Sequence, residues 1–331
     1  MSFRQAITVV PAVFLFLLLS SATFNTPSKA LSEETIRVAV PLFPALGFPL
    51  FVASDKGYFQ KEGLRAEIVR INSTPTTYQA LLSGGVDVAI GAPSGLVTLN
   101  LQGTEVVTIG SWDNVMPYIL ATREKITDLG QLRGKKLAVN RPGSTPWLIM
   151  RVLLEDAGLS KDVQLLPLAG GSQERLAALK TSGIEAAPVS WALEPTLKKM
   201  GLYSFKGNKT PFLTGAICVK RSYLQSHRST LKRFLKGLLE AAQFVLADKK
   251  GTFPILAKIL RTEDKEALEF AYDYMRLNES PALYPPADAI KNLLRMAAYE
   301  DPRAASVRPE MIADFSILEE LGQKNPQPPQ R

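Results

Sequence analysis

The chain has 331 residues, of which 46% are hydrophobic, and its formal net charge at pH 7 is +8. A chain of this length can build one large domain or two medium ones, each with its own core. The positive charges form no dense Lys/Arg block, which argues against nucleic-acid binding and favours anionic solutes only weakly. One cysteine, Cys218, and one histidine, His227, exclude an intrachain disulfide, a Cys/His zinc cluster and a dithiol redox pair.

The two singular residues have simple interpretations. Cys218 lies in an apolar run, which predicts a buried structural thiol. His227 lies among polar residues at the expected start of a helix, which predicts a solvated side chain and no catalytic base.

Residues 1–30 have the pattern of a secretory signal peptide. Arg4 supplies the positive start, an apolar stretch runs from Val9 to Leu19, and Ser28-Lys29-Ala30 is a suitable cleavage site. Cleavage after Ala22 and retention of the segment as an anchor are the alternatives. Because no cysteine lies near the cleavage region, we expect no lipid attachment and a periplasmic location.

Over residues 36–220, short apolar runs alternate with segments of helical periodicity, which is typical of parallel sheets with right-handed crossovers. In chain order, strands are expected at 36–41, 66–71, 86–91, 106–111, 118–122, 136–139, 163–166, 184–189 and 213–220. Helices are expected at 49–63, 76–82, 94–101, 129–134, 146–158, 173–183 and 193–201. Residues 228–321 have apolar residues at i, i+3 and i+4, which predicts an almost wholly helical region. The proline-rich tail, 323–331, is expected to be disordered.

Four expected strand-to-helix turns are rich in small, hydroxyl, Gly and Pro residues. They are 73–76, 92–95, 142–146 and 170–172. Helix N-termini carry unpaired N–H groups and partial positive charge, so such turns suit carboxylate, sulfonate, phosphate or nitrate groups. All four lie at carboxyl ends of strands, where ligands of open α/β sheets bind. Ordinary helix capping is the alternative for each turn.

Aromatic residues follow the ends of the same strands. Trp112, Trp147 and Trp191 are expected near one region, with Phe43 and Phe48 adding to an apolar wall. Such a wall would suit a ligand with an aromatic face or a cation held against a ring. Packing in the core or at a hinge is the alternative for each tryptophan. Glu194, just after Trp191, is the acid placed nearest this region, and an ordinary first-turn helix acid is the alternative.

The candidate ligand-binding residues come from both series of turns. They are Phe43, Gly47, Phe48, Ser73, Thr74, Ser94, Gly95, Trp112, Gly143, Ser144, Thr145, Trp191 and Glu194. No catalytic residue, metal ligand or cofactor is expected. The run Gly91-Ala92-Pro93-Ser94-Gly95 lacks the spacing of a nucleophile elbow, and no phosphate-binding loop or dinucleotide fingerprint occurs.

Three stretches resemble the nitrate/sulfonate/taurine class of substrate-binding proteins of ABC transporters. They are Val52-Ala53-Ser54-Asp55-Lys56-Gly57-Tyr58-Phe59-Gln60-Lys61-Glu62-Gly63-Leu64, Gln79-Ala80-Leu81-Leu82-Ser83-Gly84-Gly85-Val86-Asp87-Val88-Ala89 and Leu129-Gly130-Gln131-Leu132-Arg133-Gly134-Lys135-Lys136-Leu137-Ala138-Val139. The likeness covers about residues 34–220, and more loosely extends to 320.

The resemblance implies a type II periplasmic binding fold with two α/β lobes joined by two crossings. Lobe 1 would comprise 31–113 plus 214–322, with a helical C-terminal extension, and lobe 2 would comprise 114–213. A small molecule would lie between the lobes, and Ser94, Ser144 and Thr145 match positions that the class uses. The implied partners are a membrane permease and its ATPase, with the binding protein itself a monomer. The class has relatives that handle thiamine pyrimidine precursors, and the aromatic, proline-rich loop 43–48 departs from a plain anion-binding loop.

Several functional alternatives stay open. The ligand-bound protein could signal to a membrane sensor in place of a permease. An enzyme on the same fold is a second alternative, although the cysteine-rich motif of the enzymatic relatives is absent, since Cys218 stands alone. A purely structural envelope protein is the third, and it would lack a closable cleft.

Overall fold

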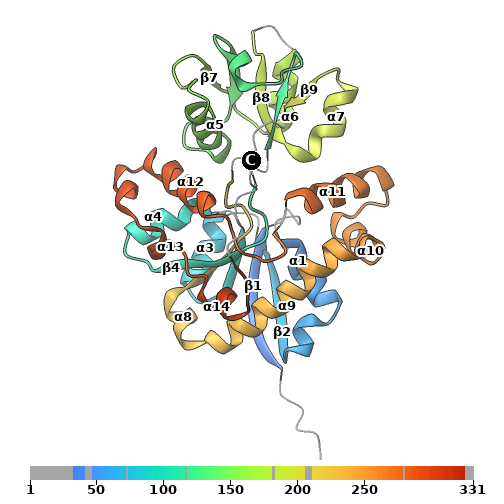
Figure 1. The fold of residues 1–331 in the computed structure, drawn as a ribbon, viewed down its shortest axis with the longest axis vertical. Coiled ribbons are helices and arrows are strands. Elements are labelled where there is room, and N and C mark those ends of the chain that lie inside the picture. Colours follow the sequence, from blue (N-terminus) through green and yellow to red (C-terminus); the bar gives the residue numbers. More distant parts are fainter. Residues whose placement is uncertain are drawn as a thin grey trace, which may run out of the picture. The chain divides into compact units, whose positions relative to one another are not determined.

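The computed structural model describes residues 33–41, 47–71, 74–91, 93–115, 118–180, 183–205, 211–278 and 280–324, all within one compact unit. The expected signal peptide and residues 325–331 of the expected tail therefore lie outside the described residues. Among the helices of the described ranges, none is both long and apolar enough for a membrane crossing. Figure 1 shows the arrangement of the elements.

The first sheet has five strands in the order β2-β1-β3-β10-β4. They are β1 (Glu34–Pro41), β2 (Leu64–Ile71), β3 (Val88–Gly91), β4 (Val106–Ser111) and β10 (Ala216–Lys220). β1 pairs in parallel with β2, in a register from Glu34 opposite Leu64 to Pro41 opposite Ile71, and also with β3. β10 is antiparallel to both of its neighbours.

The second sheet repeats this plan in the order β7-β6-β8-β5-β9. Its strands are β5 (Tyr118–Thr122), β6 (Lys136–Val139), β7 (Gln164–Pro167), β8 (Ala186–Ser190) and β9 (Tyr203–Phe205). β6 is parallel to β7 and β8, whereas β5 is antiparallel to β8 and β9. The expected parallel pairing is found between β1 and its neighbours β2 and β3, and between β6 and its neighbours β7 and β8. The strand that enters each sheet from the other one, β10 or β5, runs antiparallel to its neighbours. β9 was not predicted.

Helices alternate with these strands as the periodicity predicts. They are α1 (Phe48–Asp55), α2 (Tyr58–Lys61), α3 (Thr74–Leu82), η2 (Pro93–Gly95), α4 (Leu96–Leu101), η3 (Leu129–Leu132), α5 (Thr145–Asp156), α6 (Ser172–Lys180), η4 (Trp191–Leu193) and α7 (Glu194–Lys199). The single helix expected at 49–63 is two helices, because Gly57 between them has φ +73°, a conformation that suits glycine.

The C-terminal part is almost wholly helical, as expected. Its elements are α8 (Arg221–Ser226), α9 (Arg228–Ala247), α10 (Lys249–Leu260), α11 (Lys265–Asn278), α12 (Ala287–Ala298), η5 (Pro302–Ser306), α13 (Pro309–Ile312) and α14 (Ser316–Glu320). α9 packs on α1 and α2, where Phe234 stacks on Phe59 with ring centroids 5.3 Å apart. Gly237 permits this approach, since a Cβ there would lie 2.9 Å from Phe59 Cδ1.

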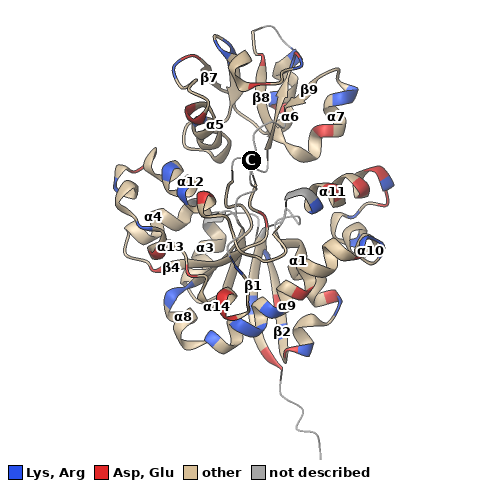
Figure 2. Ribbon diagram, in the orientation of Figure 1, with Lys and Arg blue, Asp and Glu red and all other residues tan. Residues whose placement is uncertain are grey.

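The two singular residues behave as predicted. Cys218 is buried on β10, its Sγ lies 3.6 Å from the Tyr78 hydroxyl, and burial raises the pKa of the thiol to about 12. His227 is exposed and stacks on Tyr223. Figure 2 shows Lys and Arg interspersed with Asp and Glu along the helices, so the positive excess is not gathered on one element.

Two chain segments cross between the sheets, one from β4 to β5 and the other from β9 to β10. Val115 of the first pairs with Pro211 of the second in an antiparallel bridge. The Asp113 carbonyl accepts hydrogen bonds from the main-chain N–H groups of Thr214 (3.1 Å) and Gly215 (3.0 Å). The crossings are therefore tied to each other by main-chain hydrogen bonds, as strands in a sheet are.

Candidate functional site

A polar cluster lies at the carboxyl edge of the second sheet. Asn140 follows β6, Ser190 ends β8, and Ser172 begins α6 after β7. The Ser172 hydroxyl accepts a hydrogen bond from the Ser190 N–H at 2.9 Å. Arg175, one turn into α6, donates from Nε to the Pro188 carbonyl at 2.8 Å, from Nη2 to Ser172 Oγ at 3.2 Å, and from Nη1 to Asn140 Oδ1. One buried guanidinium thus connects the ends of neighbouring strands.

The partners of Arg175 are neutral oxygens. Its side chain is only 2% exposed, and no ion pair involves it among the described residues. Burial lowers the pKa of Arg175, while the neighbouring Tyr118 and Glu174 oppose this. The Glu174 carboxylate instead accepts the Gly171 N–H at 2.7 Å. Because a guanidinium remains protonated in proteins, this edge carries a positive charge that no carboxylate of the described ranges neutralises in an ion pair.

Trp191 begins the next element along the same edge and contacts α11 of the C-terminal region. Its ring stacks on Tyr274 with centroids 3.8 Å apart and planes 9° apart, and Phe270 lies 5.4 Å away at 34°. Trp191 is 6% exposed. Trp191 therefore packs against an aromatic surface in this structure, and its contact with a ligand stays a prediction.

A second contact joins α5 of the second sheet to α12. Arg295 forms ion pairs of 3.0 Å with Glu155 and with Asp156, and the Tyr299 hydroxyl bonds to Glu155. The Arg151 guanidinium lies over the rings of Trp147 (5.0 Å) and Tyr299 (4.6 Å). Arg151 thus connects Trp147 on its own helix to Tyr299, which follows α12.

The start of α5 faces a carboxylate. A Cβ at Gly143 would overlap Oε1 of Glu300, which follows α12. Ser144 precedes the helix, but its hydroxyl donates to the Arg141 carbonyl at 2.7 Å and caps no helix N–H. Thr145 is the first residue of α5, and all three residues of this turn are partly exposed. The expected anion-binding turn therefore has one of the protein's own acids beside it.

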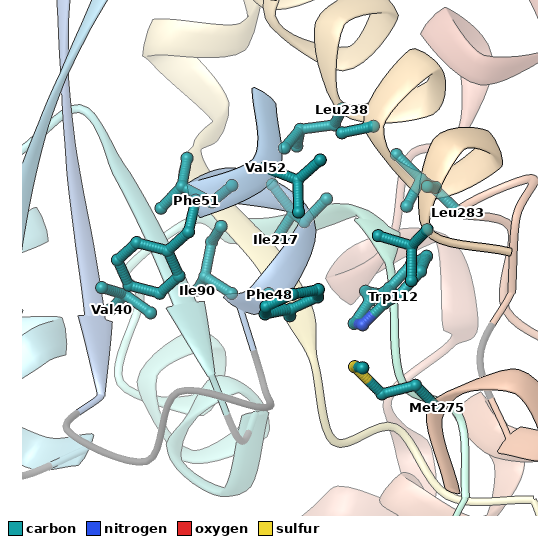
Figure 3. Close-up of a cluster of buried hydrophobic side chains, with 14 of the residues drawn as sticks. Val40, Phe48, Phe51, Val52, Ile90, Trp112, Ile217, Leu238, Met275 and Leu283 are labelled. Atoms are coloured by element: carbon teal, nitrogen blue, oxygen red, sulfur yellow. The ribbon is translucent and has the colours of Figure 1, made fainter. Parts of the chain in front are cut away.

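The candidates from the first sheet divide between core and helix starts. Phe48 is fully buried and Trp112 is 2% exposed, and Figure 3 shows them in one cluster with Met275 and Leu283. Gly47 precedes α1, where a Cβ would lie 2.6 Å from Val40 Cγ2, and Gly95 precedes α4. These two rings are core residues, and their contact with a ligand stays a prediction.

The remaining candidates lie at helix starts or outside the described residues. Phe43 and Ser73 lie outside the described residues, whereas Thr74 begins α3 and Ser94 lies within η2. Glu194 is 9% exposed and accepts a hydrogen bond from Ser204 Oγ at 2.9 Å, which is a structural partner. The role of all of these residues in binding stays a prediction.

Sequence reasoning did not identify Arg175, Asn140 or Tyr274. No clear signal for Arg175 exists in the sequence, because α6 has no strong apolar periodicity and the burial of Arg175 beside Leu179 is seen only in the structure. Tyr274 had no signal either, since only the packing of α11 brings it to Trp191.

The crossing carries a perturbed acid. Asp113 is 3% exposed, and burial raises the pKa of its carboxyl from 3.8 to about 7, against the opposing effects of the Val115 N–H and of Thr214. The Val115 N–H donates to Asp113 Oδ1 at 3.3 Å. The segment that links the two sheets therefore holds a titratable group close to neutral pH.

No metal site is formed by the described residues, since no group of three His, Cys, Asp or Glu side chains gathers there.

Comparison with known proteins gives one family and a consistent set of relatives. The family model described as NMT1/THI5 like matches residues 47–251. A Bacillus subtilis protein, named provisionally as the binding protein YtlA, is 24% identical over 257 residues, 73% of this chain and 74% of its own. Another B. subtilis protein, named provisionally as an aliphatic sulfonates-binding protein, is 26% identical over 70% of this chain and 71% of its own.

Solved structures give the same architecture. The periplasmic aliphatic sulphonate binding protein SsuA of Escherichia coli superposes with a TM-score of 0.64 at 16% identity, covering 82% of this chain and 94% of its own. The periplasmic nitrate-binding protein NrtA of Synechocystis PCC 6803 gives a TM-score of 0.62 at 16% identity, covering 87% and 88%. These likenesses confirm the expected periplasmic binding protein fold with a helical C-terminal region.

Proposed function

The chain belongs to the NMT1/THI5-like family, and from this premise we propose that it is an extracytoplasmic solute-binding protein of an ABC importer. It holds a small solute between the carboxyl edges of its two sheets and delivers it to a membrane permease with an associated ATPase. The relatives named as binding proteins support this role, as does the secretory pattern of residues 1–30.

The observation that carries the proposal is the construction of the second sheet's carboxyl edge. Asn140, Ser172 and Ser190 are partly exposed and surround the buried charge of Arg175, and Trp191 follows directly. In open α/β sheets this edge is where ligands bind. A buried cation with neutral partners strengthens hydrogen bonds to an anionic group placed at the edge, because charge-assisted bonds are stronger than neutral ones.

In the proposed mechanism, the two hydrogen-bonded crossings act as the hinge for lobe closure. In this proposal, residues 31–113 plus 214–322 form one lobe and residues 114–213 the other, and they rotate about the crossings. A solute that contacts both lobes favours the closed form, because it gains contacts there that the open form lacks. Micromolar affinity needs about 8 kcal/mol net, which a few charge-assisted hydrogen bonds and one stacked ring can supply.

We propose a solute with an anionic or an aromatic part. The anionic part is favoured by Arg175 and by the sulphonate- and nitrate-binding proteins among the structural neighbours. The aromatic part is favoured by the Trp191–Tyr274 stack, since a flat solute could take the place of one ring. A formylaminopyrimidine-binding protein of Halalkalibacterium halodurans, 27% identical over 108 residues, supports a pyrimidine as the second candidate.

A thermal-shift screen tests the proposal. The purified mature chain is unfolded and refolded to release any retained solute, and is then heated with methanesulfonate, taurine, nitrate, benzoate or cytosine. A compound that binds only the folded chain raises the melting temperature in proportion to ln(1 + [L]/Kd). A saturable rise with at least one compound is expected, and no turnover of that compound should be detected. Turnover would support the enzyme alternative, and a flat response to all five would count against solute binding.

A further inference from the structure

The segment that crosses from β4 to β5 contains two buried polar side chains that have no partner in the described part of the chain. Among these residues, the Trp112 indole Nε1 and both polar atoms of the Asn114 amide, Nδ2 and Oδ1, form no hydrogen bond. Trp112 is 2% exposed and Asn114 is 5% exposed. Buried polar groups are satisfied in the great majority of cases, so each such group requires an explanation.

The other buried amide of this region is satisfied. Asn292, which is 6% exposed, donates from Nδ2 to the Pro211 carbonyl of the second crossing at 2.8 Å and accepts from Arg295 Nη1 at 3.1 Å. Asn100, which is half-buried, likewise donates to two carbonyls, at 2.9 and 2.8 Å. Asn114 therefore differs from the asparagines that this fold uses to hold itself together.

The main chain holds Trp112 and Asn114 firmly. The Trp112 N–H donates to the Gly215 carbonyl at 3.1 Å, the Trp112 carbonyl accepts from Ser280 at 2.9 Å, and the Asn114 carbonyl accepts from Phe212 at 3.0 Å. Asp113 between them is held by Thr214 and Gly215. Side chains on a backbone fixed in this way are positioned in advance, which is what recognition of a small molecule requires.

Two residues of extended chain span at most about 7 Å, so both side chains can reach one small molecule. Figure 3 shows the Trp112 indole in the cluster with Phe48 and Met275, which are apolar side chains and supply no strong acceptor for its N–H. An amide presents a donor and an acceptor side by side, and its complement is a group with an adjacent acceptor and donor, as in a lactam or an amino-substituted aza ring.

We propose that Asn114 and Trp112 bind the solute at the crossing through hydrogen bonds. The solute presents an adjacent N–H donor and carbonyl or aza acceptor to the Asn114 amide, and a further acceptor to Trp112 Nε1. This inference rests on the proposed solute-binding function and specifies part of its substrate. Because these groups lie on the crossing itself, a solute bonded to them contacts the part of the chain about which the lobes move.

The test uses 2-pyridone, which has such a donor–acceptor edge, and 1-methyl-2-pyridone, which has the same ring with the N–H blocked. The variants are Asn114→Leu, Trp112→Phe and the matched control Asn292→Leu. The solute-free Asn114→Leu variant should melt at the wild-type temperature or above it, because an apolar group of similar shape replaces one that is desolvated without compensation. Asn292→Leu should melt several degrees lower, because it removes two hydrogen bonds.

2-Pyridone should raise the melting temperature of the wild type and of Asn292→Leu, but not that of Asn114→Leu, and Trp112→Phe should weaken the rise. 1-Methyl-2-pyridone should have no effect. Equal effects of the two pyridones, an undiminished effect in Asn114→Leu, or a destabilised Asn114→Leu would each overturn the inference. If neither pyridone raises the melting temperature while methanesulfonate, nitrate or benzoate does, the inference fails and solute binding stands. If no compound raises the melting temperature, the inference and the proposed solute-binding function both fail.

Discussion

Trp191 and Tyr274 stack face to face, with ring centroids 3.8 Å apart. Trp191 follows β8 of the second sheet, whereas Tyr274 lies on α11. The residue after Tyr274, Met275, is buried in the same cluster as Trp112, which follows β4. Successive residues of a helix point about 100° apart, so α11 can contact both tryptophans at once. One helix of the C-terminal region therefore connects the carboxyl edge of the second sheet to the start of the crossing.

Removing this stack should cost measurable stability. Tyr274→Ala loses a half-buried ring and its stacking on Trp191, and we expect a fall of about 1–3 kcal/mol in the free energy of unfolding, measured in urea. Tyr203→Ala is the control, because this tyrosine is 46% exposed and should change the value by less than about 0.5 kcal/mol. Equal losses in the two variants would show that the stack contributes nothing particular.

Arg175 should matter for both stability and anion binding. Arg175→Met removes the Arg175 donor from Asn140 Oδ1 and the Pro188 carbonyl, and one of the two donors of Ser172 Oγ. We expect the free energy of unfolding, measured in urea, to fall by about 2–4 kcal/mol. Arg175→Lys keeps the positive charge but lacks the planar, forked guanidinium, and its free energy of unfolding should fall less.

Titration calorimetry with methanesulfonate separates the electrostatic role of Arg175 from the structural one. Affinity should fall most in Arg175→Met and partly recover in Arg175→Lys. Arg133→Met removes an arginine whose side chain is 65% exposed. It should leave the affinity for methanesulfonate and the free energy of unfolding nearly unchanged. Unaltered affinity in a folded Arg175→Met variant would assign Arg175 a purely structural role.

The contact between α5 and α12 should be weak and sensitive to salt. Arg295→Met removes ion pairs to Glu155 and Asp156, whose side chains are 52% and 42% exposed. We expect a loss of up to about 1 kcal/mol at low ionic strength, and a smaller one at 1 M salt, because exposed ion pairs are screened. Lys291→Met breaks the more exposed pair with Asp288 and should cost less. A loss of several kcal/mol that salt does not reduce would contradict this interpretation.

Asp113 should make stability depend on pH in a defined direction. Burial raises the pKa of Asp113 to about 7, so between about pH 4 and pH 7 the folded chain holds a proton that the unfolded chain has lost. The folded state therefore loses relative stability as the pH rises through this window. Asp113→Asn cannot ionise, and its stability relative to the wild type should rise with pH, by up to about 4 kcal/mol at pH 8.

Urea unfolding of both proteins at pH 4.5 and pH 8 checks this prediction, since the other titratable groups are common to the two proteins and cancel. A stability difference between the two proteins that does not change from pH 4.5 to pH 8 would mean that burial does not raise the pKa of Asp113, and would contradict this prediction.

Local patterns predicted most of the elements, because a buried strand and an amphipathic helix each impose a periodicity on the chain. The break at Gly57 and the strand β9 (Tyr203–Phe205) were missed. The first depends on one positive φ inside an apolar run. The second is a short strand of mostly half-exposed residues that is defined by its pairing with β5. The antiparallel direction of β5 and β10 follows from where the chain crosses between sheets, which periodicity does not encode.

The site was less accessible from the sequence. Strand ends and tryptophans predicted the edges at which a ligand would bind, and that stays a prediction. In the structure Phe48 and Trp112 are core residues, and Ser144 bonds to the Arg141 carbonyl. Asn114 looked like any polar loop residue, because its burial without a partner arises only when the two crossings pair. The burial of Arg175 likewise depends on how α6 packs on β8, which its weakly periodic sequence does not encode.

Native mass spectrometry of the mature chain, purified without unfolding, tests the central claim most directly. The account predicts a population heavier than the polypeptide by the mass of one small molecule, which gentle activation releases intact and which is lost in Arg175→Met or Asn114→Leu. The wild-type protein would be purified from cells grown with sulfonates, nitrate and pyrimidines, and then incubated with these compounds. A spectrum that shows only the mass of the bare polypeptide in both cases would contradict the account.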